Sequence, residues 1–300
     1  MKNIKSIILI LLIAVGILFY INPLLKKTST VVETAEIKTE VLTGTNFFKG
    51  SWAELLKKAK KENKLVFVDL YFTGCAPCAQ MDAKVFPNKE VSTILNNQFI
   101  SFKTDIFKEE IGKKLSMKYA VTGFPTFLFL TSNGKILDIS SGFHSTEELI
   151  AILSSTQKKA TEKIYKKYSP ILDLEYPEFY KAAYIDGKRN VSFETVDNYL
   201  KKQKDLGDEI PFVIIAGLGA NGIYADYIIE NASQLAKDYS RMQIRNLIIK
   251  IIGKYAKTYG KKENQETFSN ALEKVKPIFT EQEWLKFEKI FQSNFKKHNT

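Results

Sequence analysis

Cysteine and histidine are scarce in this chain, which has only two of each among its 300 residues. Both cysteines fall in one tetrad, Cys75-Ala76-Pro77-Cys78, so no third thiol exists to form a disulfide elsewhere. A structural zinc site needs four ligands, and His144 and His298 stand at distant and unrelated spacings. The composition therefore excludes a disulfide-rich scaffold and argues against a zinc site. We expect neither a metal nor another cofactor.

Acidic residues are also fewer than basic ones, with 33 Asp and Glu against 44 Lys and Arg and a net charge of +11. No dense basic run is interleaved with aromatic residues. We therefore interpret the excess lysines as solvated helix faces and expect no nucleic-acid partner. Apolar residues make up 45% of the chain, which is enough for a sizeable core.

A long hydrophobic run lies near the start of the chain, where residues 7–25 carry no charged side chain. This length suits a single membrane span of about 20 residues. We expect residues 1–25 to form an uncleaved membrane anchor. A secretory signal cleaved near Val32-Glu33-Thr34-Ala35 is the alternative. Residues 26–47, rich in Thr, Val and Glu, are expected to form a linker.

The cysteine tetrad stands where an expected buried strand, Leu65–Phe72, gives way to a helix beginning at about Ala76. Cys75 then lies at the helix N-terminus, where unpaired N–H groups and the helix dipole favour the thiolate. Cys78 lies one turn further on and can attack a mixed disulfide formed at Cys75. Pro77 fits the first helical turn. The pattern indicates a dithiol–disulfide exchange pair, with a structural disulfide as the alternative.

Asp69 falls inside the same expected strand. Burying a carboxylate costs several kcal/mol unless it is satisfied or neutral, so we expect the pKa of Asp69 to be raised. A carboxyl group of that kind suits a proton acceptor for the Cys78 thiol. An aspartate that merely bonds nearby backbone groups is the alternative.

Three features in this order resemble the thioredoxin-fold family over residues 48–156. They are the tetrad after a strand, Asp69 six residues before the first cysteine, and Gly123-Phe124-Pro125-Thr126. The expected element order, βαβ followed by ββα, agrees with an α/β fold in which helices flank a mixed sheet. The resemblance implies that Asp69 accepts the proton and that Pro125 is cis and lies against the sulfurs. It also implies that the backbone of Phe124 pairs with an extended substrate segment.

The surface around the first sulfur departs from the usual pattern of the family. Gly74 stands where the family usually has Trp, and Ala76-Pro77 replaces Gly-Pro, so we expect a more open surface. Gly74, Ala76, Pro77, Phe124 and Pro125 are the expected substrate-binding residues. Gly142 matches a family glycine near the substrate groove, and we expect His144 to be an ordinary surface or turn histidine.

Strand signals fade after about residue 156, and residues 157–300 are expected to form an α-helical domain. Helical-hairpin repeats are possible there, although no strict 34-residue signature occurs. Nothing in this half carries recognisable chemistry, so we expect it to recognise a partner or to position the redox domain. The expected helices are Thr156–Tyr168, Pro177–Ile185, Glu194–Gln203, Pro211–Leu218, Ala225–Tyr239, Met242–Tyr259, Glu263–Val275 and Glu281–Phe295.

These features predict a membrane-anchored thiol–disulfide oxidoreductase whose body lies on the periplasmic side and reduces protein disulfides. Its expected partners are disulfide-containing proteins, an upstream thiol reductant or oxidant, and a membrane reached through residues 7–25. Pro77 in the third tetrad position resembles reducing family members, so a reductase is preferred to an oxidase or isomerase. A membrane-tethered scaffold that acts through its helical half and a thiol redox sensor are the alternatives.

Overall fold

The computed structural model describes residues 44–219, 221–261 and 264–298, which belong to one compact unit. The predicted anchor, residues 1–25, lies outside these ranges. Within them, no single helix is long and apolar enough to cross a membrane. Helices α9 (Glu209–Leu218) and α10 (Ile223–Glu230) reach that length and apolarity only as a pair, bent by 114°.

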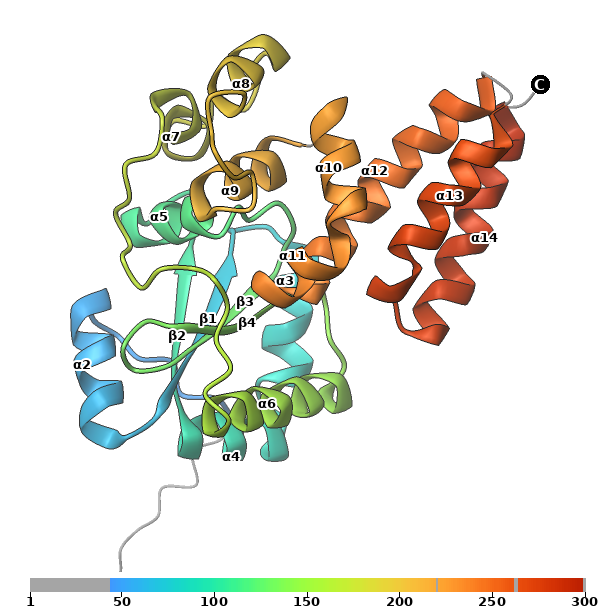
Figure 1. Cartoon of the computed structure of the whole chain (residues 1–300). Coiled ribbons are helices and arrows are strands. Elements are labelled where there is room, and N and C mark those ends of the chain that lie inside the picture. Colours follow the sequence, from blue (N-terminus) through green and yellow to red (C-terminus); the bar gives the residue numbers. More distant parts are fainter. Residues whose placement is uncertain (1–43, 220, 262–263, 299–300) are drawn as a thin grey trace, which may run out of the picture. The chain divides into compact units, whose positions relative to one another are not determined.

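A four-stranded sheet, in the order β2-β1-β3-β4, forms the centre of the first half (Figure 1). β1 is parallel to β2 and antiparallel to β3, and β4 pairs with β3 in the antiparallel direction. Gly134, with φ of +78°, lies in the turn between the last two strands. The mixed sheet confirms the predicted α/β class. The strands are β1 (Leu65–Tyr71), β2 (Phe99–Asp105), β3 (Thr126–Leu130) and β4 (Ile136–Ser141).

Helices cover both faces of this sheet, as the two-residue alternation of a strand requires. Val66, Val68 and Leu70 of β1 face the core shared with α2 and α5, whereas Phe67 faces the core shared with η1, α4 and α6. A capping box between Ser51 and Glu54 starts α2, with each side chain bonded to the backbone N–H of the other residue. The helices of this half are α2 (Trp52–Glu62), α3 (Ala76–Gln80), the π-helical turn η1 (Met81–Val85), α4 (Lys89–Gln98), α5 (Glu110–Lys118) and α6 (Thr146–Thr161).

The second half is helical, as predicted, but two expected helices differ. No helix spans Thr156–Tyr168, because α6 itself continues to Thr161 and then ends where Lys163 adopts a left-handed φ of 56°. The expected helix Ala225–Tyr239 is divided at Asn231. Besides α9 and α10, this half contains α7 (Glu178–Ile185), α8 (Phe193–Leu200), α11 (Ala232–Asp238), α12 (Arg241–Lys261), α13 (Gln265–Val275), the short 3-10 helix η2 (Lys276–Ile278) and α14 (Glu281–His298).

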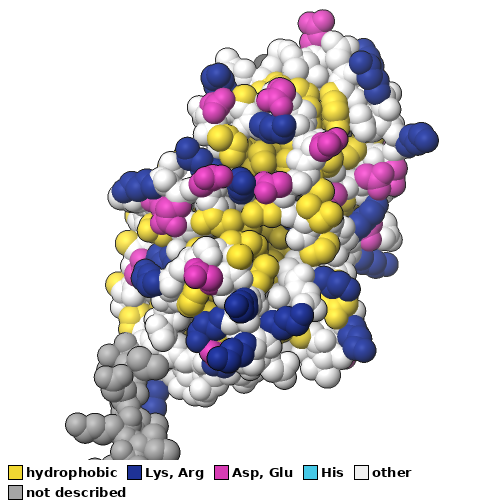
Figure 2. Space-filling model, turned by 90° about the vertical axis from the view of Figure 1, so that its left-hand side faces the viewer, with side chains coloured by type: hydrophobic (Ala, Val, Ile, Leu, Met, Phe, Trp, Pro, Cys, Tyr) yellow, Lys and Arg dark blue, Asp and Glu magenta, His cyan; other side chains and the backbone are white. Residues whose placement is uncertain are grey.

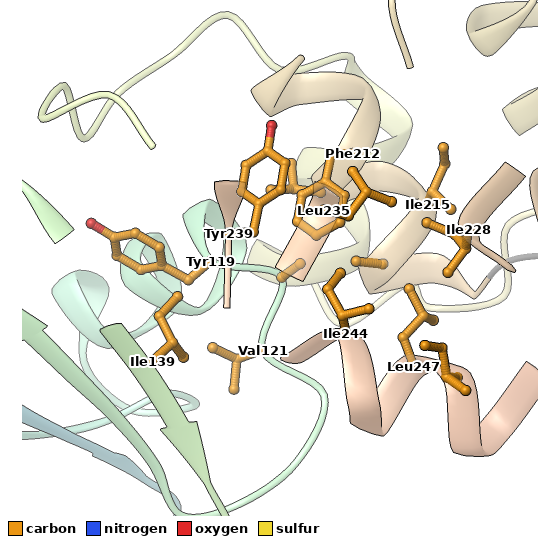
Figure 3. Packing of buried hydrophobic residues seen from close by; sticks show 14 of the residues in the cluster. Tyr119, Val121, Ile139, Phe212, Ile215, Ile228, Leu235, Tyr239, Ile244 and Leu247 are labelled. Atoms are coloured by element: carbon orange, nitrogen blue, oxygen red, sulfur yellow. The ribbon is translucent and has the colours of Figure 1, made fainter. Parts of the chain in front are cut away.

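One hydrophobic core joins the two halves (Figure 3). Tyr119 and Ile139 from the sheet side are buried in the same cluster as Phe212, Tyr239 and Ile244 from the helices. The rings of Phe212 and Tyr239 stack with centroids 3.7 Å apart, and both side chains are fully buried. The helical half is therefore packed onto the sheet-containing half rather than joined to it only by a linker.

Helix α12 also protects the edge strand β4. The Ser240 hydroxyl donates to the backbone carbonyl of Ile139 at 2.7 Å, and the backbone N–H of Ser141 points to Met242 Sδ at 3.4 Å. An uncovered edge strand offers unpaired backbone groups to other chains. The start of α12 satisfies two of those groups in β4.

Candidate active site

Cys75 and Cys78 form a disulfide, with their Cα atoms 5.3 Å apart. Cys75 is the N-cap residue of α3, and the backbone N–H of Cys78 points at Cys75 Sγ from 3.2 Å. The predicted position of the first cysteine at a helix start is confirmed. In the reduced protein, this N–H and the helix N-terminus favour a thiolate at Cys75.

Both sulfur-bearing residues are recessed, since Cys75 is 5% exposed and Cys78 only 2%. The rim beside them is open, because Thr73, Gly74 and Ala76 are exposed. Gly74 has a left-handed φ of +95°, and a Cβ atom there would meet nothing within 4 Å. Because Gly74 stands where the thioredoxin fold usually has tryptophan, the space beside it is open. Cys75 itself lies below this rim. A partner must present a protruding segment to reach it.

Asp105, at the end of β2, anchors the loop that carries the tetrad. Its Oδ2 accepts hydrogen bonds from the backbone N–H and the hydroxyl of Thr73, at 2.9 and 2.7 Å. Its Oδ1 accepts from the N–H of Phe107 at 2.9 Å. Burial opposes ionisation, but these hydrogen bonds outweigh it and hold the pKa of Asp105 below its usual value. Sequence analysis missed this residue. An acidic residue at the end of the expected strand Phe99–Thr104 could have indicated it, because that strand runs parallel to the one leading to Cys75.

Asp69 is completely buried in β1, and burial raises its pKa to about 6. The predicted direction of this pKa shift is confirmed. Lys103 of β2 opposes the shift, with its Nζ 3.1 Å from Asp69 Oδ2. This ion-pair contact does not have hydrogen-bond geometry, and neither carboxyl oxygen has a hydrogen-bond partner among the described residues. The carboxyl group can therefore exchange a proton near neutral pH.

Lys103 is the second site residue that sequence analysis missed. Its ammonium group pairs with Asp82 as well as with Asp69, and it lies 4.6 Å from the centroid of the Tyr71 ring. A lysine inside the apolar strand Phe99–Asp105 was the signal, because a buried ammonium group needs an anionic partner. Strand register supplies that partner, since Lys103 lies directly opposite Asp69.

The Phe124–Pro125 peptide bond is cis, as the family resemblance implied. The Phe124 ring lies edge-on against Phe72, with centroids 5.1 Å apart, and the Phe72 carbonyl accepts the N–H of Cys75 at 3.1 Å. The backbone N–H of Gly142 donates to the carbonyl of Pro125 at 2.8 Å. The fold thus brings the cis-proline segment together with the tetrad loop.

The comparisons with known proteins identify this half of the chain. The family model for a thioredoxin-like domain matches residues 52–157. Thioredoxin-1 of Drosophila yakuba is 30% identical over 79 residues, which cover 26% of this chain and 68% of that protein. The chain belongs to the thioredoxin-like family. The tetrad of this thioredoxin-like domain holds its two cysteines as a disulfide, which is the pair of sulfurs that thiol–disulfide exchange requires.

Two further matches differ from that with Thioredoxin-1 in how much of each chain they cover. Uncharacterized protein B0495.5 of Caenorhabditis elegans is 26% identical over 213 residues, covering 65% of this chain but only 28% of that protein. The solution structure of a putative disulphide-isomerase from Bacteroides thetaiotaomicron is 33% identical. It matches 38% of this chain and 95% of its own, with a TM-score of 0.36.

His144 of the thioredoxin-like domain differs from its prediction. It lies in the loop between β4 and α6 and is only 6% exposed, so the surface part of the expectation of a surface or turn histidine is wrong. Its Nε2 lies 2.6 Å from Ser140 Oγ, and its ring is 5.9 Å from that of Phe127. Burial lowers the pKa of His144, which favours a neutral structural role. No cluster of possible metal ligands occurs among the described residues.

Proposed function

We propose that the protein reduces disulfide bonds of other proteins outside the cytoplasm, held at a membrane by residues 7–25. In this proposal, residues 26–47 form a linker, residues 48–156 a redox domain and residues 157–300 a helical domain. The main support is the position of Cys75, a helix N-cap that receives the N–H of Cys78. The charge-free N-terminal run and the occurrence of disulfides in oxidising compartments support the location. Secretion after signal cleavage is the alternative.

The first step is attack by the Cys75 thiolate on one sulfur of a substrate disulfide. A bond forms between Cys75 Sγ and that sulfur, and the other substrate sulfur leaves as a thiolate. Phe124, next to the cis-proline Pro125, offers its backbone to the extended substrate segment. Gly74, Ala76 and Pro77 form the rim over which this segment passes.

The second step resolves the mixed disulfide. The Cys78 thiol gives its proton to Asp69, and its sulfur attacks Cys75 Sγ, releasing the second substrate thiolate. The protein is left with the Cys75–Cys78 disulfide, having passed two electrons to its substrate. Alternation places Asp69 on the same sheet face as Phe67, which packs against η1 directly after the active-site helix. An upstream dithiol must then reduce the protein again.

Insulin reduction tests the exchange chemistry. With dithiothreitol as electron source, wild-type protein is expected to accelerate precipitation of the insulin B chain, and Cys75→Ser is expected to abolish the acceleration. Asp69→Asn should slow the second step on the order of 10²-fold, the usual contribution of a general base. Wild-type protein with no effect beyond dithiothreitol alone would contradict the proposed function.

The reduction potential tests the direction. A reductase is expected to have a value nearer to about −270 mV than to about −120 mV, the potentials of a reducing and a strongly oxidising family member. Equilibration with glutathione or dithiothreitol buffers, read by thiol labelling, gives the value. A potential at or above about −150 mV would reject the reductase direction.

Covalent trapping and cell fractionation test the substrates and the location. Cys78→Ser should retain substrates on Cys75, because the mixed disulfide can no longer be resolved. The intact chain is expected in the membrane fraction after alkaline washing. A soluble product that starts after residue 35 would support the secreted alternative.

A further inference from the structure

A groove of about 470 Å³ lies between the loop that follows β2 and the end of α7. The face of the molecule over α2, α5 and α7 carries hydrophobic side chains between charged ones (Figure 2). Ile106, Phe107, Val121 and Phe124 contribute one side of the groove. The other side comes from the helical half, through Tyr184, Ile185, Asp186, Gly187 and Arg189.

The groove continues from the active site. Phe107 and Phe124 both lie against Phe72, with ring centroids 5.7 and 5.1 Å from it, and the carbonyl of Phe72 accepts the N–H of Cys75. Phe107 is 61% exposed, an unusual exposure for a large aromatic side chain beside a reactive disulfide. A segment that pairs with the backbone of Phe124 would therefore enter this groove on one side of its cysteine.

Two hydrogen bonds attach the helical side of the groove to the redox domain. The Tyr180 hydroxyl donates to the carbonyl of Met117 at 2.8 Å, and the Tyr184 hydroxyl donates to that of Val121 at 3.4 Å. Tyr180 and Tyr184 are buried, so these bonds fix α7 against the loop that leads to Phe124. The groove is thus a preformed feature of the joined halves.

The charges of the groove favour an acidic occupant. Lys113 and Arg189 line it, and the Arg189 guanidinium lies 3.7 Å from the centroid of the Tyr184 ring, where it stacks on the aromatic face. In the described part of the chain, the only ion pair made by a groove-lining residue is that of Asp186 with Lys188, at 3.7 Å. Lys188 therefore partly balances the acidic residue of the groove, whereas neither of its two cations is engaged by a carboxylate of the described residues.

We infer that this groove binds an extended, acidic segment of the substrate protein next to the cysteine under attack. This inference rests on the proposed function and adds a substrate class to it. Apolar side chains of the segment contact Phe107 and Ile185, and its carboxylates face Lys113 and Arg189. The helical half thus contributes to substrate selection, because residues at the end of α7 form one side of the groove next to the disulfide.

Paired peptide disulfides test this inference. The two peptides differ only in carrying Glu or Lys at the third to fifth positions on either side of the cysteine. At low salt, wild-type kcat/KM should be about five- to twentyfold higher for the acidic peptide, and the ratio should fall at high salt. Arg189→Glu and Lys113→Glu should each lower kcat/KM for the acidic peptide about three- to fivefold.

The matched control is Lys289→Glu, the same charge reversal at an exposed lysine of α14 outside the groove lining. It should change the peptide ratio less than twofold. The neutral disulfide bis(2-hydroxyethyl) disulfide should be reduced equally by all variants, because it is too small to reach the groove. Equal rates for the two peptides, or equal effects of Lys289→Glu and Arg189→Glu, overturn the inference. A wild-type protein that fails to reduce even the small disulfide overturns the proposed function itself.

Discussion

At the scale of single residues, the chemistry depends on how Asp69 is held. A carboxyl with no exposed surface and one lysine contact favours its neutral form more than an aspartate in water does. Because the folded protein binds this proton more tightly than the unfolded chain, the contribution of Asp69 to stability is greatest at low pH. Stability falls as the pH rises from about 4, the ordinary value, to about 6, and stays lower above that.

Asp69→Asn removes this titration. Between pH 4 and pH 7, the free energy of unfolding of the variant relative to wild type is expected to shift by roughly 2 to 3 kcal/mol in favour of the variant. Urea unfolding of the oxidised protein at both pH values measures the difference. If the two proteins keep a constant difference, Asp69 does not titrate in this window.

The pKa of Asp105 is shifted in the opposite direction to that of Asp69, so its effect on stability has the opposite pH dependence. Since its pKa is lowered in the folded protein, the stability that it contributes is present at neutral pH and lost as the pH falls below about 4. Asp105→Asn is expected to cost about 1 to 3 kcal/mol at pH 7, through its bonds to Thr73 and Phe107. The penalty should shrink toward pH 3. A penalty that persists undiminished at pH 3 would show that the ionised carboxylate is not what holds the loop.

At the scale of helices, strands and turns, the sequence predicts those features that depend on residues close together in the chain. The capping box at Ser51, the strand leading to Cys75 and the turn at Gly134 all depend on neighbouring residues, and all are present. The end of α6 could not be predicted, since residues 156–168 keep a helical pattern and only the left-handed backbone at Lys163 stops the helix. His144 was misjudged because the residues that bury it, Met81 and Phe127 among them, come from distant elements.

Phe212 tests the packing between elements. Its ring stacks on Tyr239 in the core that joins the two halves, and no part of it is exposed. Phe212→Ala should lower the free energy of unfolding by about 3 to 5 kcal/mol, through lost burial and the resulting cavity. The matched change at an exposed ring, Phe193→Ala, should cost far less. Chemical unfolding followed by tyrosine fluorescence compares them, and equal losses would contradict the shared core.

At the scale of the whole molecule, buried polar contacts join the halves. Lys118 of α5 is 1% exposed, and its ammonium group lies 2.6 Å from a carboxylate oxygen of Glu209 in α9, 91 residues later in the chain. Burial lowers the pKa of Lys118, and Glu209 opposes that shift. Nothing in the sequence pairs these two residues, because only the packing of α9 on α5 brings them together.

Glu209→Gln leaves the Lys118 ammonium group buried without its anionic partner. We expect a loss of about 3 to 5 kcal/mol in the free energy of unfolding. Glu178→Gln removes a carboxylate from an exposed pair with Lys181 and should change stability by less than about 1 kcal/mol. Urea unfolding of both variants makes the comparison. Similar small changes in both would mean that the Lys118–Glu209 pair does not hold the halves together.

The most direct measurement for the whole molecule is the pH dependence of alkylation of the reduced protein by iodoacetamide, with each cysteine followed by mass spectrometry. An exposed cysteine with an ordinary pKa reacts with a midpoint near pH 8.5, whereas a helix N-terminus lowers this value. We predict that Cys75 reacts first, with a midpoint at or below about pH 7, and that Cys78 reacts more slowly. Equal rates with midpoints near pH 8.5, or faster reaction at Cys78, would contradict the account.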